Sequence, residues 1–190
     1  MSLLPENRIA VLDTETNLYD KVMSVGMVIA DARTFSPVGS MYLLIDPEYR
    51  VPGMFSDVLF HDRAKVDGTV SRKNAVGLIR TMLDDYRVGD IFAYNACFDK
   101  GHLPELSDYS WYDIIRLAAN RNYNRCIGDD IPCFSTGRMK CGYGAERIYR
   151  MLSGCRYSEV HNALADAEDE LCIMKMLGIE IGEYGIARLK

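Results

Sequence analysis

The chain has 190 residues, of which 48% are hydrophobic and 26% are charged, and its net charge is −5. These values are ordinary for a globular protein, and they exclude disordered, collagen-like and coiled-coil classes. Since a domain has about 150 residues on average, we expect residues 1–190 to form a single domain. The negative charge argues against a protein that coats nucleic acid by bulk charge.

Three short apolar segments with β-branched residues predict successive strands in the first quarter of the chain. They span residues 8–14, 22–30 and 39–46. Because the links between them are short, we expect an antiparallel meander. The stretch that follows, residues 47–71, mixes Pro, Gly and charged residues and predicts a long surface connection.

Helices and strands alternate after this connection. Apolar residues at helical spacing predict helices, and short apolar runs predict strands. The helices are expected at residues 72–86, from about 98, at 114–120, 143–153 and 162–177, and the strands at residues 90–94 and 111–112. Three strands followed by strand–helix units predict an α/β protein with a mixed five-stranded sheet and flanking helices.

The N-terminal sequence MSLLPENR lacks the basic stretch, apolar core and cleavage site of a signal peptide. No window approaches the roughly 18 apolar residues of a membrane span. We therefore expect a cytoplasmic protein whose six cysteines are free thiols.

Cys97 and Cys172 lie within apolar patterns and are expected in the core. Cys126, Cys133 and Cys141 raise the alternative of a zinc site, although no C-x-x-C pair and no obvious fourth ligand accompany them.

The middle of the chain is basic, with eight Lys or Arg and three Asp or Glu residues in 116–156. Its loop, residues 121–141, is longer than most connections, so we expect it to be an inserted or mobile segment. Arginines that alternate with aromatic residues suit a single nucleic-acid strand. The alternative is that the tyrosines pack in the core and the arginines are solvated.

Acidic residues stand at the end of the first predicted strand. Asp13 and Glu15 point to the same side of a strand whose other residues are apolar. Two carboxylates at the end of a buried strand repel each other and resist desolvation. A hard divalent cation is their natural partner, although the two residues taken alone are more simply explained as the cap of a turn.

Two further motifs follow. Asn95 and Asp99 come directly after the strand at 90–94, where open α/β sheets place chemistry. His161 is expected on the approach to the last helix and Asp166 within it, among alanines that leave space for a polar site. The alternatives are a capping role and a solvated acidic helix face, since Asp166 is followed by three more acidic residues.

The motifs DTE, NACFD and HNALAD, in this order, resemble those of the DEDDh-type 3′–5′ exonucleases. This family includes the DNA polymerase III epsilon proofreading subunit, ribonuclease T and oligoribonuclease. The resemblance covers residues 8–177 and implies a ribonuclease-H-like fold. Two departures, Asn17 and Leu18 in the first motif and Tyr94 before the second, remove no ligand but put the terminal-nucleotide pocket in doubt.

The resemblance also implies a mechanism with two Mg²⁺ or Mn²⁺ ions. The metal ligands would be Asp13, Glu15, Asp99 and Asp166, with Asp13 bridging both ions. His161 would take the proton of the attacking water, because imidazole exchanges protons near neutral pH. Substrate contacts are expected at the backbone of Thr16 and at Asn95, although Asn95 is more simply explained as the residue that orients the turn carrying Asp99.

The function expected from this resemblance is release of nucleoside monophosphates from 3′ ends of single-stranded DNA or RNA. One alternative is an end-binding module that has lost catalysis, which the complete ligand set disfavours. Another is a proofreading subunit of a polymerase. Because only residues 178–190 follow the last predicted helix, we do not expect the polymerase-binding tail of such a subunit.

Overall fold

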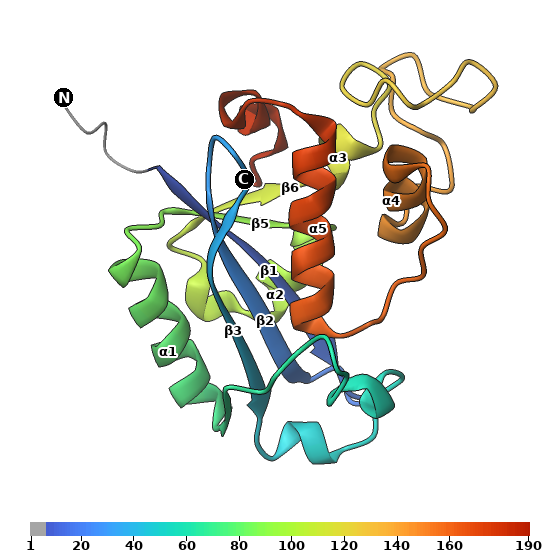
Figure 1. Cartoon of the computed structure of the whole chain (residues 1–190). Helices are drawn as coiled ribbons and strands as arrows, with labels where there is room; N and C mark the ends of the chain where they lie inside the picture. The colour runs from blue at the N-terminus through green and yellow to red at the C-terminus, as the bar shows by residue number, and fades with distance from the viewer. Residues whose placement is uncertain (1–6) are drawn as a thin grey trace, which may run out of the picture.

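The computed structural model describes residues 7–190. Six strands form one mixed sheet in the order β4-β3-β2-β1-β5-β6 (Figure 1). The strands are β1 (Arg8–Thr16), β2 (Val22–Asp31), β3 (Pro37–Ile45), β4 (Gly68–Val70), β5 (Asp90–Ala93) and β6 (Ser110–Asp113).

Five α-helices and four short 3₁₀ turns complete the described chain. The helices are α1 (Arg72–Asp85), α2 (Ala96–His102), α3 (Ile115–Ala118), α4 (Ala145–Ser153) and α5 (Ala163–Leu177). The 3₁₀ turns are η1 (Glu48–Arg50), η2 (Ser56–Val58), η3 (Pro104–Leu106) and η4 (Ile181–Ala187). None of the helices in residues 7–190 has the length and apolar character needed to cross a membrane.

The mixed α/β sheet with flanking helices is confirmed. β1, β2 and β3 pair as the expected antiparallel meander, and β5 and β6 continue the sheet in parallel from β1. The sheet has one strand more than expected, because Gly68–Val70 pairs in parallel with the end of β3. This three-residue strand has no apolar alternation, so it was hidden in the stretch interpreted as a surface connection.

Side chains of β1 alternate between two apolar cores on opposite faces of the sheet. Ile9 and Val11 face the core beneath α5, while Ala10 and Leu12 face the core beneath α1. Because alternation continues along the strand, Asp13 and Glu15 point to the α5 face. In Figure 1, α5 crosses this face of the sheet in front of β1 and β2.

Helix α5 rests directly on the backbone of β2 at Gly26. A Cβ atom at this position would overlap the main chain of Ala163 and Leu164 at the start of the helix. Gly26 is also the residue that pairs with Asp13 across the β1–β2 ladder. The absence of a side chain therefore lets the first turn of α5 approach the acidic end of β1.

The loop 121–141 folds back on itself and packs against the α5 side of the sheet. Met139 is fully buried in that core and forms an antiparallel bridge with Cys133. The buried Asn124 side chain donates a hydrogen bond to the carbonyl of Ala118 at 2.8 Å. Apolar and hydrogen-bonded contacts thus connect this loop to the sheet and to α3.

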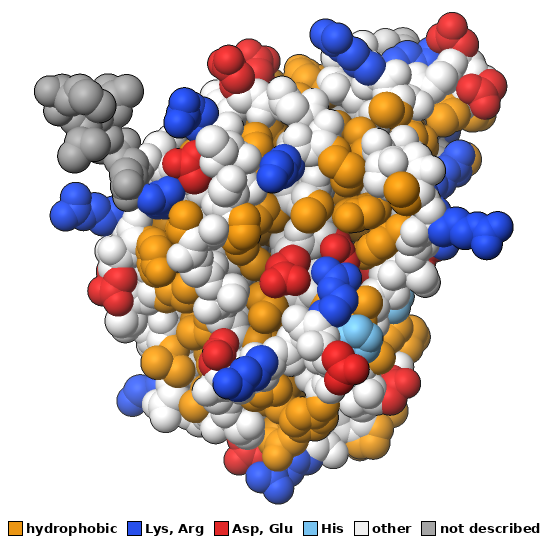
Figure 2. Space-filling model, in the orientation of Figure 1, with side chains coloured by type: hydrophobic (Ala, Val, Ile, Leu, Met, Phe, Trp, Pro, Cys, Tyr) orange, Lys and Arg blue, Asp and Glu red, His pale blue; other side chains and the backbone are white. Residues whose placement is uncertain are grey.

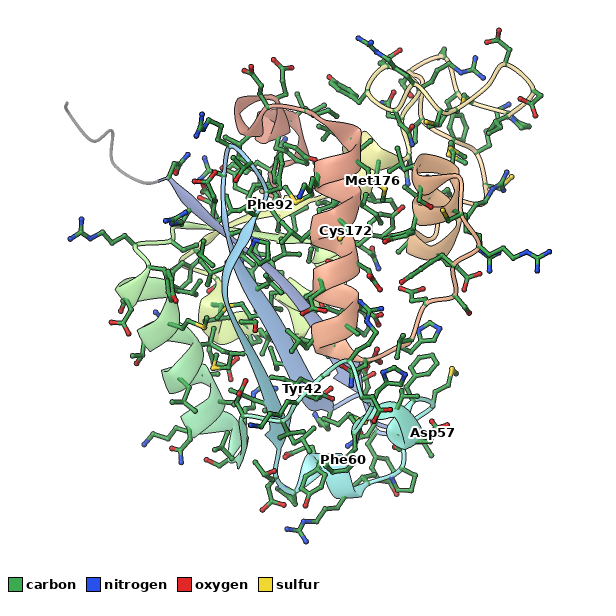
Figure 3. All side chains as sticks on the ribbon, in the orientation of Figure 1. Tyr42, Asp57, Phe60, Phe92, Cys172 and Met176 are labelled. Atoms are coloured by element: carbon green, nitrogen blue, oxygen red, sulfur yellow. The ribbon has the colours of Figure 1, made fainter. Side chains whose placement is uncertain are left out.

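The expected core positions of two cysteines are wrong. Cys97 and Cys172 are both exposed. Cys97 follows the first residue of α2 and lies across the helix from the buried Asp99, and Cys172 lies on the outer side of α5 (Figure 3). Their apolar neighbours in sequence face inward, and a helical period places the cysteines on the other side.

Candidate metal and active site

Asp13 stands near the end of the central strand, with its side chain under the first turns of α5. Its Oδ2 atom is inaccessible to solvent and has no hydrogen-bond partner among residues 7–190. Burial, followed by the charges of Asp99 and other nearby carboxylates, raises the pKa of Asp13 well above its ordinary value. A buried carboxylate oxygen without a partner is costly, and a cation would offset that cost.

Glu15 lies two residues further along the same face and is 9% exposed. Burial raises its pKa to about 8, and the carboxylate of Asp166 is the next contribution. The β1–β2 register shifts directly after Glu15, at Thr16. The predicted substrate-contact residue Thr16 therefore stands at an irregularity of the strand that carries both carboxylates.

Asp99 is brought to the site by helix α2 and is 1% exposed. Its Oδ1 atom accepts hydrogen bonds from the Thr14 main chain at 3.1 Å and from the Thr14 hydroxyl at 2.8 Å. These bonds stabilise the ionised form, but burial outweighs them and raises the pKa of Asp99 to about 7. Thr14 thus joins α2 to β1 between Asp13 and Glu15.

Asn95, the other residue of this motif, starts α2 in the left-handed conformation, with φ of 67°. Its main-chain N–H donates to the Asp113 carboxylate at 3.0 Å, and its main-chain carbonyl accepts the N–H of Phe98 at 2.8 Å. Both observations support the interpretation of Asn95 as a residue that orients the turn carrying Asp99. Its side chain is exposed and makes no capping hydrogen bond.

Asp166 lies in the first turn of α5, is 4% exposed, and has a buried Oδ1 atom without a hydrogen-bond partner. Burial, followed by the charge of Glu159, raises its pKa to about 7. One ligand atom each from Glu15, His161 and Asp166 lie within 4.8 Å of one another. The structure therefore brings together three of the predicted site residues from β1, the approach to α5 and α5 itself.

His161 precedes the helix in a left-handed conformation, with φ of 60°. Its ring stacks on Phe55, with ring centroids 3.9 Å apart and planes 12° apart. Phe55 belongs to the stretch that was expected to be a plain surface connection. That expectation is wrong for this part of residues 47–71, because the connection folds under the N-terminus of α5 and fixes the imidazole.

Asn162 is a further site residue that the sequence did not single out. It is the N-cap of α5, where its side-chain oxygen accepts the N–H of Ala165, and it is fully buried. Its side-chain nitrogen donates to the hydroxyl of Tyr42 at 3.0 Å and to the carbonyl of Val58 at 2.8 Å. Tyr42 lies on β3 close to the start of α5 (Figure 3). These bonds fix the residue next to His161.

Two of the three acidic residues after Asp166 are buried and do not belong to a solvated face. Asp169 and Glu170 are 7% and 4% exposed, and Asp169 forms a two-point ion pair with Arg63 at 2.8 and 2.9 Å. Tyr157 also donates to Asp169 at 2.7 Å. The run of four charges hides these differences in the sequence, because adjacent helix positions face different directions.

Some basic side chains of residues 116–156 form hydrogen bonds and ion pairs within the protein. Arg121 donates to two carbonyls of its own loop, and Arg150 pairs with Glu146 at 2.6 Å. Tyr149 stacks on a neighbouring tyrosine and packs against the core. On the face shown in Figure 2, Lys and Arg side chains are dispersed and form no continuous patch. These contacts favour the structural interpretation of Arg121, Arg150 and Tyr149.

The donor set fits a hard divalent cation. It consists of carboxylates, which Mg²⁺ and Mn²⁺ prefer, and two of its members carry buried oxygen atoms without a partner. Across residues 7–190, the single group of three or more metal-ligating side chains found close together contains no cysteine. The loop cysteines are therefore not assembled into a zinc site.

Comparison with known proteins supports the fold. No family model and no curated protein sequence match the chain. Escherichia coli Exonuclease I in complex with a dT13 oligonucleotide is 16% identical with a TM-score of 0.62, over 93% of this chain and 42% of that chain. The zinc-ion-bound Exonuclease I–ssDNA complex gives the same identity and TM-score, over 90% of this chain and 40% of that chain.

A full-length 3′-exonuclease is 11% identical with a TM-score of 0.65, over 90% of this chain and 81% of that chain. The chain spans about two fifths of Exonuclease I. At these identities the likeness concerns the course of the backbone. The chain therefore has the ribonuclease-H-like α/β fold that Exonuclease I also has.

Proposed function

We propose that this protein is a metal-dependent 3′–5′ exonuclease that releases nucleoside monophosphates from single-stranded DNA or RNA. The observation that carries the proposal is the convergence of Glu15, His161 and Asp166 within 4.8 Å, with buried oxygen atoms of Asp13 and Asp166 that have no hydrogen-bond partner among residues 7–190. The shared fold with Exonuclease I, whose structures include complexes with dT13 and dA16 oligonucleotides, supports it.

In this proposal Asp13, Glu15, Asp99 and Asp166 hold two Mg²⁺ or Mn²⁺ ions. When bound, the ions supply a hydroxide nucleophile and neutralise charge on the leaving 3′ oxygen. Negative charge on the four carboxylates then becomes favourable, which offsets the burial that raises their pKa values and, for Asp13, Glu15 and Asp166, the repulsion from nearby carboxylates.

His161 takes the proton of the attacking water. The stack on Phe55 and the neighbouring Asn162 hold the imidazole beside Glu15 and Asp166. The ring is therefore already oriented for proton transfer before the reaction begins. Thr16, at the irregular end of β1, contacts the terminal sugar through its backbone, and Asn95 orients the turn that carries Asp99.

The test uses 5′-labelled single strands of DNA and RNA with a free or a phosphorylated 3′ end, with Mg²⁺, Mn²⁺ or EDTA. We expect product ladders from the free 3′ end and loss of cleavage in EDTA. A 3′-phosphate should block the reaction, because it adds negative charge beside Asp13 and Glu15.

Equal rates on both 3′ ends, or cleavage of a circular single strand, would show an endonuclease instead. Binding of 3′ ends without any cleavage would favour the end-binding module. The DNA and RNA arms measured in parallel determine the preferred sugar, since one 2′-hydroxyl distinguishes them.

A further inference from the structure

Glu170 is a buried carboxylate that the proposed reaction does not yet use. It lies one helical turn after Asp166 on α5 and is 4% exposed. Its Oε2 atom accepts a hydrogen bond from the main-chain N–H of Tyr94 at 3.1 Å. Among residues 7–190, no Lys, Arg or His forms an ion pair with Glu170 within 4.0 Å.

This carboxylate lies on the side of the site that carries Asp13 and Asp99. Tyr94 directly follows β5, the parallel neighbour of β1, in the register that pairs Val11 with Phe92. The main chain of Tyr94 therefore lies next to the acidic end of β1. Glu170 and Asp99 are close enough that burial, followed by the charge of Asp99, raises the pKa of Glu170 well above its ordinary value.

A purely structural role does not need this charge. The N–H of Tyr94 would be satisfied equally by the amide oxygen of a glutamine, without the desolvation of an ionisable group. Asp166 is 4% exposed, and its Oδ1 atom, like the Oδ2 atom of Asp13, is a buried acceptor without a hydrogen-bond partner among residues 7–190, which a cation would satisfy. Glu170 adds a further acidic group to the same space.

We propose that Glu170 is a fifth carboxylate of the metal centre and stabilises the cation held on the Asp13–Asp99 side. Oε2 remains hydrogen-bonded to the N–H of Tyr94, which fixes the side chain, while the negative charge of the carboxylate stabilises the cation. This role rests on the proposed function, because it requires that the carboxylates bind divalent ions.

The experiment titrates Mn²⁺ into the full chain by calorimetry and compares wild type with Glu170→Gln. Glutamine keeps the shape and an oxygen acceptor for Tyr94 but removes the charge. We expect two Mn²⁺ sites in the wild type, of which the variant weakens one by about tenfold to a hundredfold. The half-saturating Mg²⁺ concentration for hydrolysis should rise in parallel.

Two matched variants separate charge from structure. Glu168→Gln removes a charge from the same helix, at a half-exposed position beside Arg63, and should leave both Mn²⁺ sites unchanged. Glu170→Asp keeps the charge on a shorter side chain and should restore part of the lost affinity. The EDTA-treated Glu170→Gln protein should melt no earlier than wild type at pH 8.

Wild-type Mn²⁺ binding by Glu170→Gln would overturn the assignment and leave Glu170 as an anchor for Tyr94 alone. Failure of the wild type itself to bind Mn²⁺ would instead overturn the metal centre, and with it the proposed function. Because the wild type is measured in the same titration, the two failures are distinguishable.

Discussion

At the scale of single residues, the site is a set of buried acids whose pKa values are raised. Glu15 reaches about 8, and Asp99 and Asp166 reach about 7, in each case chiefly because of burial. A metal-free protein therefore holds protons at neutral pH that a bound cation would displace. Replacing one carboxylate by its amide is therefore expected to maintain or raise the stability of the metal-free protein but to lower the rate of hydrolysis.

Asp13→Asn and Asp99→Asn are expected to abolish hydrolysis while the fold remains intact. In EDTA at pH 8, the melting temperature of Asp13→Asn should equal or exceed that of wild type, because a buried repulsive charge is removed. Thermal unfolding followed by circular dichroism and a cleavage assay measure the two effects. Wild-type activity in either variant would contradict the two-metal assignment.

His161→Ala should lose most activity at pH 7 and retain Mn²⁺ binding. Help from a general base is worth about 10²–10⁴-fold, and part of the loss should return as pH rises because hydroxide becomes more abundant. Single-turnover rates between pH 6 and 9 and a Mn²⁺ titration provide the measurement. A variant that no longer binds Mn²⁺ would show that His161 is a ligand or a structural support.

Of the residues that the sequence singled out, the structure brings Glu15, His161 and Asp166 together. The signal in the sequence is the order of three motifs, which contain Asp13, Glu15, Asp99, His161 and Asp166. Asp169 and Glu170 gave no comparable signal, because a run of four acidic residues in a helix reads as a solvated face. Their burial depends on partners that are distant in sequence.

At the scale of elements, the start of α5 organises the site, and its cap is Asn162. The side chain accepts one hydrogen bond from Ala165 within α5, and it donates two others, to Tyr42 and Val58, that connect α5 to β3 and to the 47–71 connection. The prediction of a surface connection is wrong here for a physical reason: Phe55 is half-buried because it stacks on His161 and packs against the core. Local composition cannot reveal such a contact.

Asn162→Ala should lower the free energy of unfolding by about 2–4 kcal/mol, since an N-cap is worth about 1 kcal/mol and each buried hydrogen bond a similar amount. Asn162→Asp is the matched control, because it keeps the acceptor for Ala165 but loses the donor to Tyr42 and Val58. Urea unfolding measures both. Equal stability of alanine and wild type would mean that Asn162 does not hold the start of α5.

At the scale of the whole molecule, the acidic site makes stability depend on pH and on metal. The folded pKa values of Glu15, Asp99 and Asp166 lie above the ordinary values of about 4. The folded state therefore binds more protons than the unfolded state between about pH 4 and pH 8. Stability contributed by these groups is present at the acidic end of this window and is lost as the pH rises through it.

We expect the melting temperature in EDTA to fall as the pH rises from 5 to 8, and Mg²⁺ or Mn²⁺ to restore it most strongly at pH 8. Cation binding should release protons, which calorimetry in buffers of different ionisation enthalpy detects. A stability profile that is flat with pH, or a metal effect that is larger at pH 5, would contradict the raised pKa values.

The fold was predictable because apolar periodicity and short links determine the sheet and its two cores. The role of Gly26 was not predictable, because a glycine within a strand does not indicate which part of the chain packs against it. The main chain of Gly26 lies directly against the main chain of Ala163, so this backbone contact sets the distance between β2 and α5. Side chains in a core can exchange for others of similar volume, and helices normally shift to accommodate them. Here the backbone contact prevents the start of α5 from moving closer to β2. The distance between the carboxylates of β1 and Asp166 should therefore stay the same when side chains of the surrounding core are replaced.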